Sequence, residues 1–186
     1  MINSSYFVVP TFAQNSWVRN SLVVVGASIL IALFALISVP LPFTPVPIAA
    51  QAQVILFLSV VLGSRRSVAA VALYLMQGAV GLPVFAGGKA GLLVLAGPTG
   101  GYLLGYLVAA FITGWISESL KEKTAWKVFG AMTVGNAAIF LFGALWLSHF
   151  VGWQGAWMLG VVPFLCGDLF KLLLATRGLK VCRFIS

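Results

Sequence analysis

Acidic side chains are nearly absent from this chain of 186 residues, whose carboxylates are Glu118, Glu122 and Asp168. Charged residues of both signs make up 8% of the sequence, whereas a soluble domain has about 25%. Hydrophobic residues make up 61%, and the mean hydropathy is +1.09. So few charges cannot cover a surface that faces water. The composition excludes a soluble enzyme, a disordered chain and a DNA-binding domain, and it predicts no nucleic-acid partner although the net charge is +8.

The residues that enzymes use for chemistry are also scarce. The one histidine, His149, has no cysteine or carboxylate near it in the sequence. The two cysteines, Cys166 and Cys182, are too few for a disulfide framework. No cluster of acidic residues and histidines has the spacing of a metal site. We therefore predict no catalytic residue, no metal and no cofactor.

A glycine-rich turn that ends in Gly87-Gly88-Lys89 partly resembles a phosphate-binding loop. The pattern G-x-x-x-x-G-K-[ST] requires glycine where Pro83 stands and serine or threonine where Ala90 stands. Both positions fail. We therefore expect that this chain does not hydrolyse nucleotide.

Long apolar runs fill most of the chain and are interrupted at prolines, glycines and charges. A helix that crosses a bilayer needs about 20 apolar residues. We therefore predict an all-α integral membrane protein, in which residues 1–186 form a single domain with a bundle of six transmembrane helices. Their expected ranges are about 17–39, 48–63, 67–80, 98–120, 125–150 and 156–178. The glycine-rich stretch 81–97 is expected to be an outward-facing loop.

The basic residues predict the orientation of these helices. With both chain ends inside, Lys89 lies on the outer side and nine basic residues lie on the inner side, namely Arg19, Arg65, Arg66, Lys121, Lys123, Lys127, Arg177, Lys180 and Arg183. Loops rich in lysine and arginine stay in the cytoplasm. We therefore expect the N- and C-termini in the cytoplasm and the protein in the cytoplasmic (inner) cell membrane.

Small residues recur at every fourth position of the predicted fourth helix, at Gly97, Gly101, Gly105, Ala109 and Thr113. They form one stripe, and such stripes let helix backbones approach closely in lipid. A weaker patch of small residues lies on the first helix, at Ala27, Ser28 and Ala32. This patch could pack inside the bundle or face a partner protein, and the sequence leaves both open.

Two charged residues fall within the predicted sixth helix. Asp168 and Lys171 are three residues apart, so they share a helix face. A charge at membrane depth costs about 2.5–3.5 kcal/mol on insertion scales, and such residues usually mark a functional site. A structural ion pair that neutralises itself is the alternative.

Other polar and aromatic residues gather toward the outer side. Gln51 opens the predicted second helix, where it binds a ligand or satisfies backbone groups at the helix start. Tyr74 lies on the third helix, close to the loop 81–91. This loop has many glycines and no acidic residue, so it is either a tight connection or a lid over an outward cavity, with Phe85 covering an apolar ligand.

Four sequence motifs together resemble one known family. They are Pro45-Val46-Pro47-Ile48 followed by Gln51, the run from Gly78 to Gly88 (GAVGLPVFAGG), the run from Gly97 to Leu103 (GPTGGYL), and Pro163-Phe164 followed by Gly167-Asp168-Leu169 and Lys171. The chain resembles the BioY family, the biotin-capturing S components of energy-coupling factor (ECF) transporters. The likeness extends over about residues 39–176.

The resemblance implies a fold, a ligand and partners. It implies six helices with an outward-opening pocket for biotin, and high-affinity capture and uptake of this vitamin without enzymatic activity. It also implies assembly with a transmembrane coupling protein and two ABC-type ATPases in the lipid bilayer. The patch Ala27, Ser28 and Ala32 would then face the coupling protein.

The resemblance also implies which residues contact biotin. The expected set is Asp168, Lys171, Gln51, Tyr74, Phe85, Gly88, Lys89 and Gly91. Asp168 would accept hydrogen bonds from the ureido N–H groups and Lys171 would donate to the ureido carbonyl. Lys89 would pair with the tail carboxylate, although a lysine departs from the family pattern at this position.

Three alternatives stay open at this stage. The chain could be an S component for another small vitamin, a membrane scaffold without a ligand, or a transporter that works without the ATPase module. A panel of ligands tests the first two, and uptake in cells that lack the module tests the third.

Overall fold

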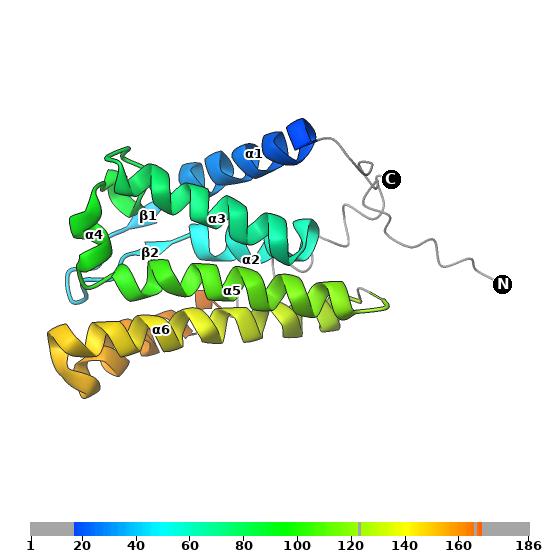
Figure 1. Ribbon diagram of the computed structural model, residues 1–186. Helices are drawn as coiled ribbons and strands as arrows, with labels where there is room; N and C mark the ends of the chain where they lie inside the picture. The colour runs from blue at the N-terminus through cyan, green and yellow to red at the C-terminus, as the bar shows by residue number, and fades with distance from the viewer. Residues whose placement is uncertain (1–16, 123, 166, 169–186) are drawn as a thin grey trace.

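The computed structural model describes residues 17–122, 124–165 and 167–168, which are mainly helical (Figure 1). The longer helices lie side by side as a bundle (Figure 1). The α-helices are α1 (Trp17–Leu36), α2 (Gln51–Leu62), α3 (Ser64–Ala79), α4 (Leu92–Ala96), α5 (Gly100–Ser119) and α6 (Ala125–Gly160). A short 3-10 helix, η1 (Ala86–Gly88), and two strands, β1 (Ser38–Val39) and β2 (Ile48–Ala49), lie in the connections.

The outside of this bundle suits a membrane. In the described residues, three helical stretches are long and apolar enough to cross one: α1, α5 and Ala125–Leu165. Helices α2, with 12 residues, and α3, with 16, are shorter. Large apolar side chains such as Leu33 and Trp115 remain exposed, which a soluble protein avoids over a continuous surface. The chain is therefore a helical membrane protein.

The strands β1 and β2 occupy positions where helix turns were predicted. Ser38 pairs with Ala49, and Val39 pairs with Ile48, in antiparallel register. Four prolines lie between the strands; proline lacks the N–H that a helix needs and favours an extended residue before it. Consequently α1 ends before the expected residue 39, and α2 begins at Gln51, three residues after the expected start.

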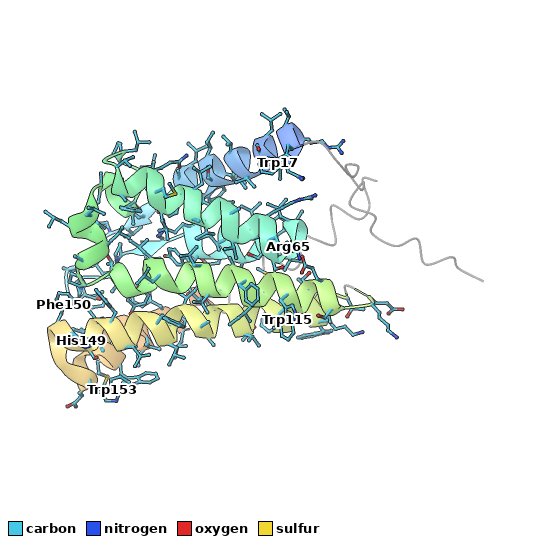
Figure 2. All side chains as sticks on the ribbon, viewed as in Figure 1. Trp17, Arg65, Trp115, His149, Phe150 and Trp153 are labelled. Carbon is cyan, nitrogen blue, oxygen red and sulfur yellow. The ribbon has the colours of Figure 1, made fainter. Side chains whose placement is uncertain are left out.

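The junction of α2 and α3 is a sharp turn at Gly63, whose φ is 81°. The first backbone N–H of α3, from Ser64, donates to Oε1 of Glu118 at 2.8 Å, and the Ser64 hydroxyl donates to Oε2 at 2.8 Å. A carboxylate at a helix start satisfies an otherwise unpaired N–H group. Because α3 begins at Ser64 and not at residue 67, Arg65 lies in its first turn, at the end of the bundle (Figure 2).

Helix α6 is interrupted at Gly152, where φ is 74° and ψ is 167°. A positive φ is strained for residues other than glycine, so this glycine ends the first part of the helix. The chain turns back at this end of the bundle (Figure 1) and reaches Asp168. The last ten residues of the expected sixth helix 156–178, residues 169–178, lie outside the described residues.

The stripe of small residues on α5 packs against α6. A side chain at Gly101 would meet Trp146 and the carbonyl oxygen of Phe142, and one at Gly105 would meet the backbone of Ile139. The two backbones therefore approach closely, as small residues permit in lipid.

The two ends of the bundle differ in charge. One end holds the start of α1, the α2–α3 turn and the α5–α6 turn (Figure 1), and these carry Arg19, Arg65, Arg66, Lys121 and Lys127. The opposite end holds η1, α4 and the Gly152 turn. There the connection between α3 and α5 contains Lys89.

Candidate functional site

A chain of buried hydrogen bonds joins α2, α3 and α5 near the Lys89 end. Gln51, the first residue of α2, donates from Nε2 to the hydroxyl of Tyr106 on α5 at 2.9 Å. Its Oε1 accepts from the hydroxyl of Tyr74 on α3 at 3.0 Å. All three residues are at most 7% exposed. Because its oxygen accepts from Gln51, the Tyr106 hydroxyl keeps its hydrogen for another acceptor.

Asp168 supplies a carboxylate next to this chain. The residue is 8% exposed, and its charge acts on the Tyr106 hydroxyl. The segment that carries Asp168 is fixed at the end of α6, where Tyr102 donates to the carbonyl of Gly160 at 2.8 Å. Thr44 donates to the preceding carbonyl, that of Leu159, at 2.7 Å.

Gln51, Tyr102 and Tyr106 border a cavity that is open to solvent. About 470 Å³ of empty space is found there, counted together with the solvent at its mouth. The apolar lining consists of Val46, Pro47, Ala49, Phe85, Ala86, Val94 and Leu103, and the polar lining consists of Gln51, Lys89, Thr99, Tyr102 and Tyr106. An apolar pocket with a few convergent polar groups is typical of small-molecule sites.

Phe85 fixes the glycine-rich loop to the bundle. Its ring is 1% exposed and lies edge-on to Tyr74, with ring centroids 5.7 Å apart and an interplanar angle of 84°. On α3, Gly78 makes room for this ring, because a Cβ there would overlap it. Thus the ring of Phe85 packs against α3, and the residue also lines the cavity.

The other predicted loop residues have different positions. Lys89 is exposed and lines the cavity. Gly88 and Gly91 are absent from the lining and form turns with φ of 73° and 91°. Their N–H groups donate to the carbonyls of Phe85 and Gly78, and their contact with a ligand stays a prediction.

The small patch on α1 lies inside the chain. Ala27 and Ser28 are buried, and Ala32 packs partly buried against the core. Gln77 of α3 donates to the Ser28 hydroxyl at 3.4 Å. The burial of these residues agrees with packing inside the bundle, one of the two roles that the sequence left open, and the contact with a partner stays a prediction.

His149 and Lys171 were also singled out in the sequence. His149 is exposed at the Lys89 end of the bundle (Figure 2), and its Nδ1 contacts the carbonyl of Leu145, as an interfacial histidine does. Lys171 lies outside the described residues, so its pairing with Asp168 stays a prediction.

Tyr102 and Tyr106 were not predicted as site residues from the sequence. They are four residues apart on α5, so both can face the cavity, and this spacing was the available signal. The hydrogen bond that connects Tyr106 to the site comes from Gln51, which is 55 positions away in the sequence.

The fold and the cavity define a class: a helical membrane protein with a small-molecule site toward one end of its bundle. Residues 7–183 match the BioY family, and the chain belongs to this family. It is similar to biotin transporter BioY2 of Lactococcus lactis subsp. cremoris, with 37% identity over 169 residues, or 89% of this chain and 91% of the relative. It is also similar to biotin transporter BioY of Thermotoga maritima, with 42% identity over 147 residues, or 78% and 85% of the two chains.

The structure is similar to a solved one of the same class. The crystal structure of the S-component for biotin from an ECF-type ABC transporter matches with a TM-score of 0.82 and 25% identity. The match covers 92% of this chain and 95% of that chain.

Proposed function

We propose that this protein is the biotin-binding S component of an ECF-type transporter, a substrate-binding subunit and not an enzyme. The observation that carries the proposal is a mainly apolar cavity lined by the hydrogen-bonded pair Gln51 and Tyr106, with the buried carboxylate of Asp168 acting on Tyr106. Biotin combines a polar ureido ring with an apolar thioether ring and aliphatic chain. This combination requires a few fixed polar groups in apolar walls.

The ureido ring is expected to bind at the buried polar groups. Its two N–H groups donate, and the Asp168 carboxylate accepts with the strength of a charge-assisted hydrogen bond. Its carbonyl accepts, and the Tyr106 hydroxyl and Lys171 are the donors that we assign to it. Gln51 orients Tyr106 from one side, and Tyr74 in turn orients Gln51.

The tail carboxylate is assigned to the mouth of the cavity. Lys89 lines this region and carries the positive charge that an anion needs. Gln51 begins α2 and Thr99 precedes α5, and both border the cavity. The N-terminal ends of helices favour negative charge. We therefore assign the carboxylate to Lys89 and these helix starts.

We propose that the loop 81–97 is a lid that is anchored by Phe85. Phe85→Ala is expected to accelerate the release of bound biotin about tenfold, because it removes the ring that attaches the loop to Tyr74 and Gly78 and most affinity differences arise in dissociation rates. The rate of loss of radiolabelled biotin after addition of excess unlabelled biotin measures the effect. Leu82→Ala, in the same loop but with an exposed side chain, is the matched control; equal rates for both variants would contradict the lid.

We also propose the topology and the assembly. Six membrane-crossing helices with both termini in the cytoplasm agree with the basic end described above, because positively charged segments remain inside. The cavity then opens outward, and the site lies in the cytoplasmic membrane. A transmembrane coupling protein and two ABC-type ATPases are the proposed partners that drive delivery of biotin to the inside.

Binding of radiolabelled biotin to the purified protein in detergent tests the function. We expect saturable binding that is displaced by biotin and not by riboflavin or thiamine. Weaker displacement by biotin methyl ester would support a cation that contacts the carboxylate. No saturable biotin binding by folded protein would overturn the proposal, and displacement by another vitamin would change the ligand.

A further inference from the structure

The helical backbone breaks again at the end of α6, just before Pro163. A carbonyl in an α-helix accepts from the N–H four residues later, and for Leu159 that residue is Pro163, which has no N–H. The next carbonyl, that of Gly160, would accept from Phe164 in a continuous helix. The Phe164 N–H donates instead to the carbonyl of Val161 at 3.0 Å. The break therefore leaves two successive carbonyls, those of Leu159 and Gly160, without their usual helical donors.

Each of these two carbonyls accepts from a side-chain hydroxyl of another element. Thr44, in the connection between β1 and β2, donates to Leu159 at 2.7 Å, and Tyr102 of α5 donates to Gly160 at 2.8 Å. Both side chains belong to buried residues. A buried carbonyl without a donor costs free energy. The two hydroxyls therefore replace the donors that are lost at the Pro163 break.

Both hydroxyls are held in place by their surroundings. A Cβ on Gly143, in the first part of α6, would overlap the Tyr102 ring, and a Cβ on Gly160 would overlap its hydroxyl. Tyr102 thus contacts both parts of α6. The Thr44 hydroxyl also accepts from the N–H of Val46 at 3.2 Å, and Val46 lines the cavity. The break is therefore joined to α5 on one side and to the cavity wall on the other.

The position of Asp168 depends on the direction in which the chain leaves this break. Residues 162–165 and 167–168 are helical again, so Pro163 lies in a first helical turn, where a missing N–H is tolerated. Asp168 follows Pro163 by five residues, or about 7.5 Å along a helix. A tilt of this helix at the break therefore displaces the buried Asp168 side chain.

We propose that Thr44 and Tyr102 are positioning residues for Asp168. Their hydroxyls fix the two carbonyls at the break, and with them the direction of the helix that carries the Asp168 carboxylate. That this carboxylate contacts biotin rests on the proposed function. In the described part of the chain Tyr102 also lines the cavity and Thr44 does not, so substitution of Thr44 separates positioning from direct contact with the ligand.

Thermal unfolding in detergent tests the link to Pro163 without any ligand. Thr44→Val keeps the shape of the side chain and removes the donor, so the unfolding temperature should fall by about 5 °C. In the Pro163→Ala background, alanine supplies an N–H that can donate to the Leu159 carbonyl, and the same substitution should lower the temperature by less than about 2 °C. An equal fall in both backgrounds would overturn the proposal, because Thr44 would then stabilise the protein independently of the break.

Thr133→Val is the matched control. The Thr133 hydroxyl also donates to a carbonyl, that of Phe129 at 2.8 Å, but this carbonyl lies within α6 and has a helical donor of its own. The substitution should therefore change the unfolding temperature by less than about 2 °C. Tyr102→Phe removes the donor to Gly160 and should lower the temperature about as much as Thr44→Val does. A fall no larger than that of Thr133→Val would overturn the role assigned to Tyr102.

Equilibrium binding of radiolabelled biotin tests the consequence for Asp168. Thr44→Val should raise the Kd about fivefold, and Thr44→Ser, which keeps the hydroxyl, should restore binding. In the Asp168→Asn background Thr44→Val should change the Kd less than twofold, because the two residues act together. Equal losses in both backgrounds would overturn the proposal and would indicate that Thr44 acts on the cavity wall at Val46. Absence of biotin binding by the unsubstituted protein would contradict the proposed function and leave the unfolding experiment to decide on Thr44 and Pro163.

Discussion

Asp168→Asn is expected to weaken biotin binding about 10- to 100-fold while the protein still inserts and folds. Asparagine keeps the shape of the side chain but loses the charge that strengthens hydrogen bonds from the ureido N–H groups. A hydrogen bond to a charged group contributes about 1.5–3 kcal/mol, and about 1.4 kcal/mol corresponds to a tenfold change in Kd. Equilibrium binding of radiolabelled biotin to purified protein gives the ratio of the two dissociation constants.

A matched substitution separates a local effect from a general one. Glu122→Gln removes an exposed carboxylate after α5, at the basic end of the bundle, and should leave the Kd unchanged. If Asp168→Asn also leaves the Kd unchanged, then Asp168 serves structure alone, as the ion-pair alternative states. The assignment of the ureido ring to this part of the cavity would then be wrong.

Gln51→Leu is expected to weaken biotin binding by a similar factor for a different reason. The glutamine amide links the hydroxyls of Tyr74 and Tyr106, and leucine leaves both hydroxyls buried without this partner. Each unsatisfied group costs about 1–3 kcal/mol, so both the stability and the orientation of Tyr106 should suffer. Titration with radiolabelled biotin and a thermal unfolding curve, taken on the same preparation, measure the two effects.

The control for this variant is another glutamine. Gln77→Leu, at a half-buried position of α3 whose amide reaches Ser28 at 3.4 Å, should have much less effect on the Kd. A smaller loss is expected from Tyr74→Phe, because this variant removes one hydroxyl and keeps the Gln51–Tyr106 bond. If Gln51→Leu binds biotin as tightly as Gln77→Leu does, the hydrogen-bonded chain plays no part in binding.

The helical membrane class was predictable from composition, because so few charges cannot cover a soluble surface. The ends of helices were predictable where a single residue type, proline or glycine, determines them. Helix α1 ends shortly before Pro40. Helix α6 is interrupted at Gly152, between the ranges expected for the fifth and sixth helices. The pairing of β1 with β2 was not predictable, because two residues per strand leave no periodic pattern. The position of Ser64 at the start of α3 depends on Glu118, a distant residue.

The site was predictable only in part, and the reason is long-range contact. Gln51, Phe85 and Lys89 were expected from the sequence, and the structure places all three around one cavity. Tyr106 was missed, because a tyrosine within an apolar helix usually contributes to packing. The hydrogen bond from the Gly91 N–H to the carbonyl of Gly78 becomes visible only in three dimensions, and the predicted contact of Gly91 with the ligand stays a prediction.

Tyr74 belongs to two systems at once. Its hydroxyl bonds Gln51, and its ring contacts Phe85 of the loop. Any event that favours one position of this ring acts on both neighbours, so in the proposed function ligand occupancy and loop position are expected to be thermodynamically linked. Linkage is reciprocal: the factor by which bound biotin favours the closed loop equals the factor by which a closed loop favours biotin. A cross-link that holds the proposed lid closed is therefore expected to raise the affinity for biotin by up to this factor.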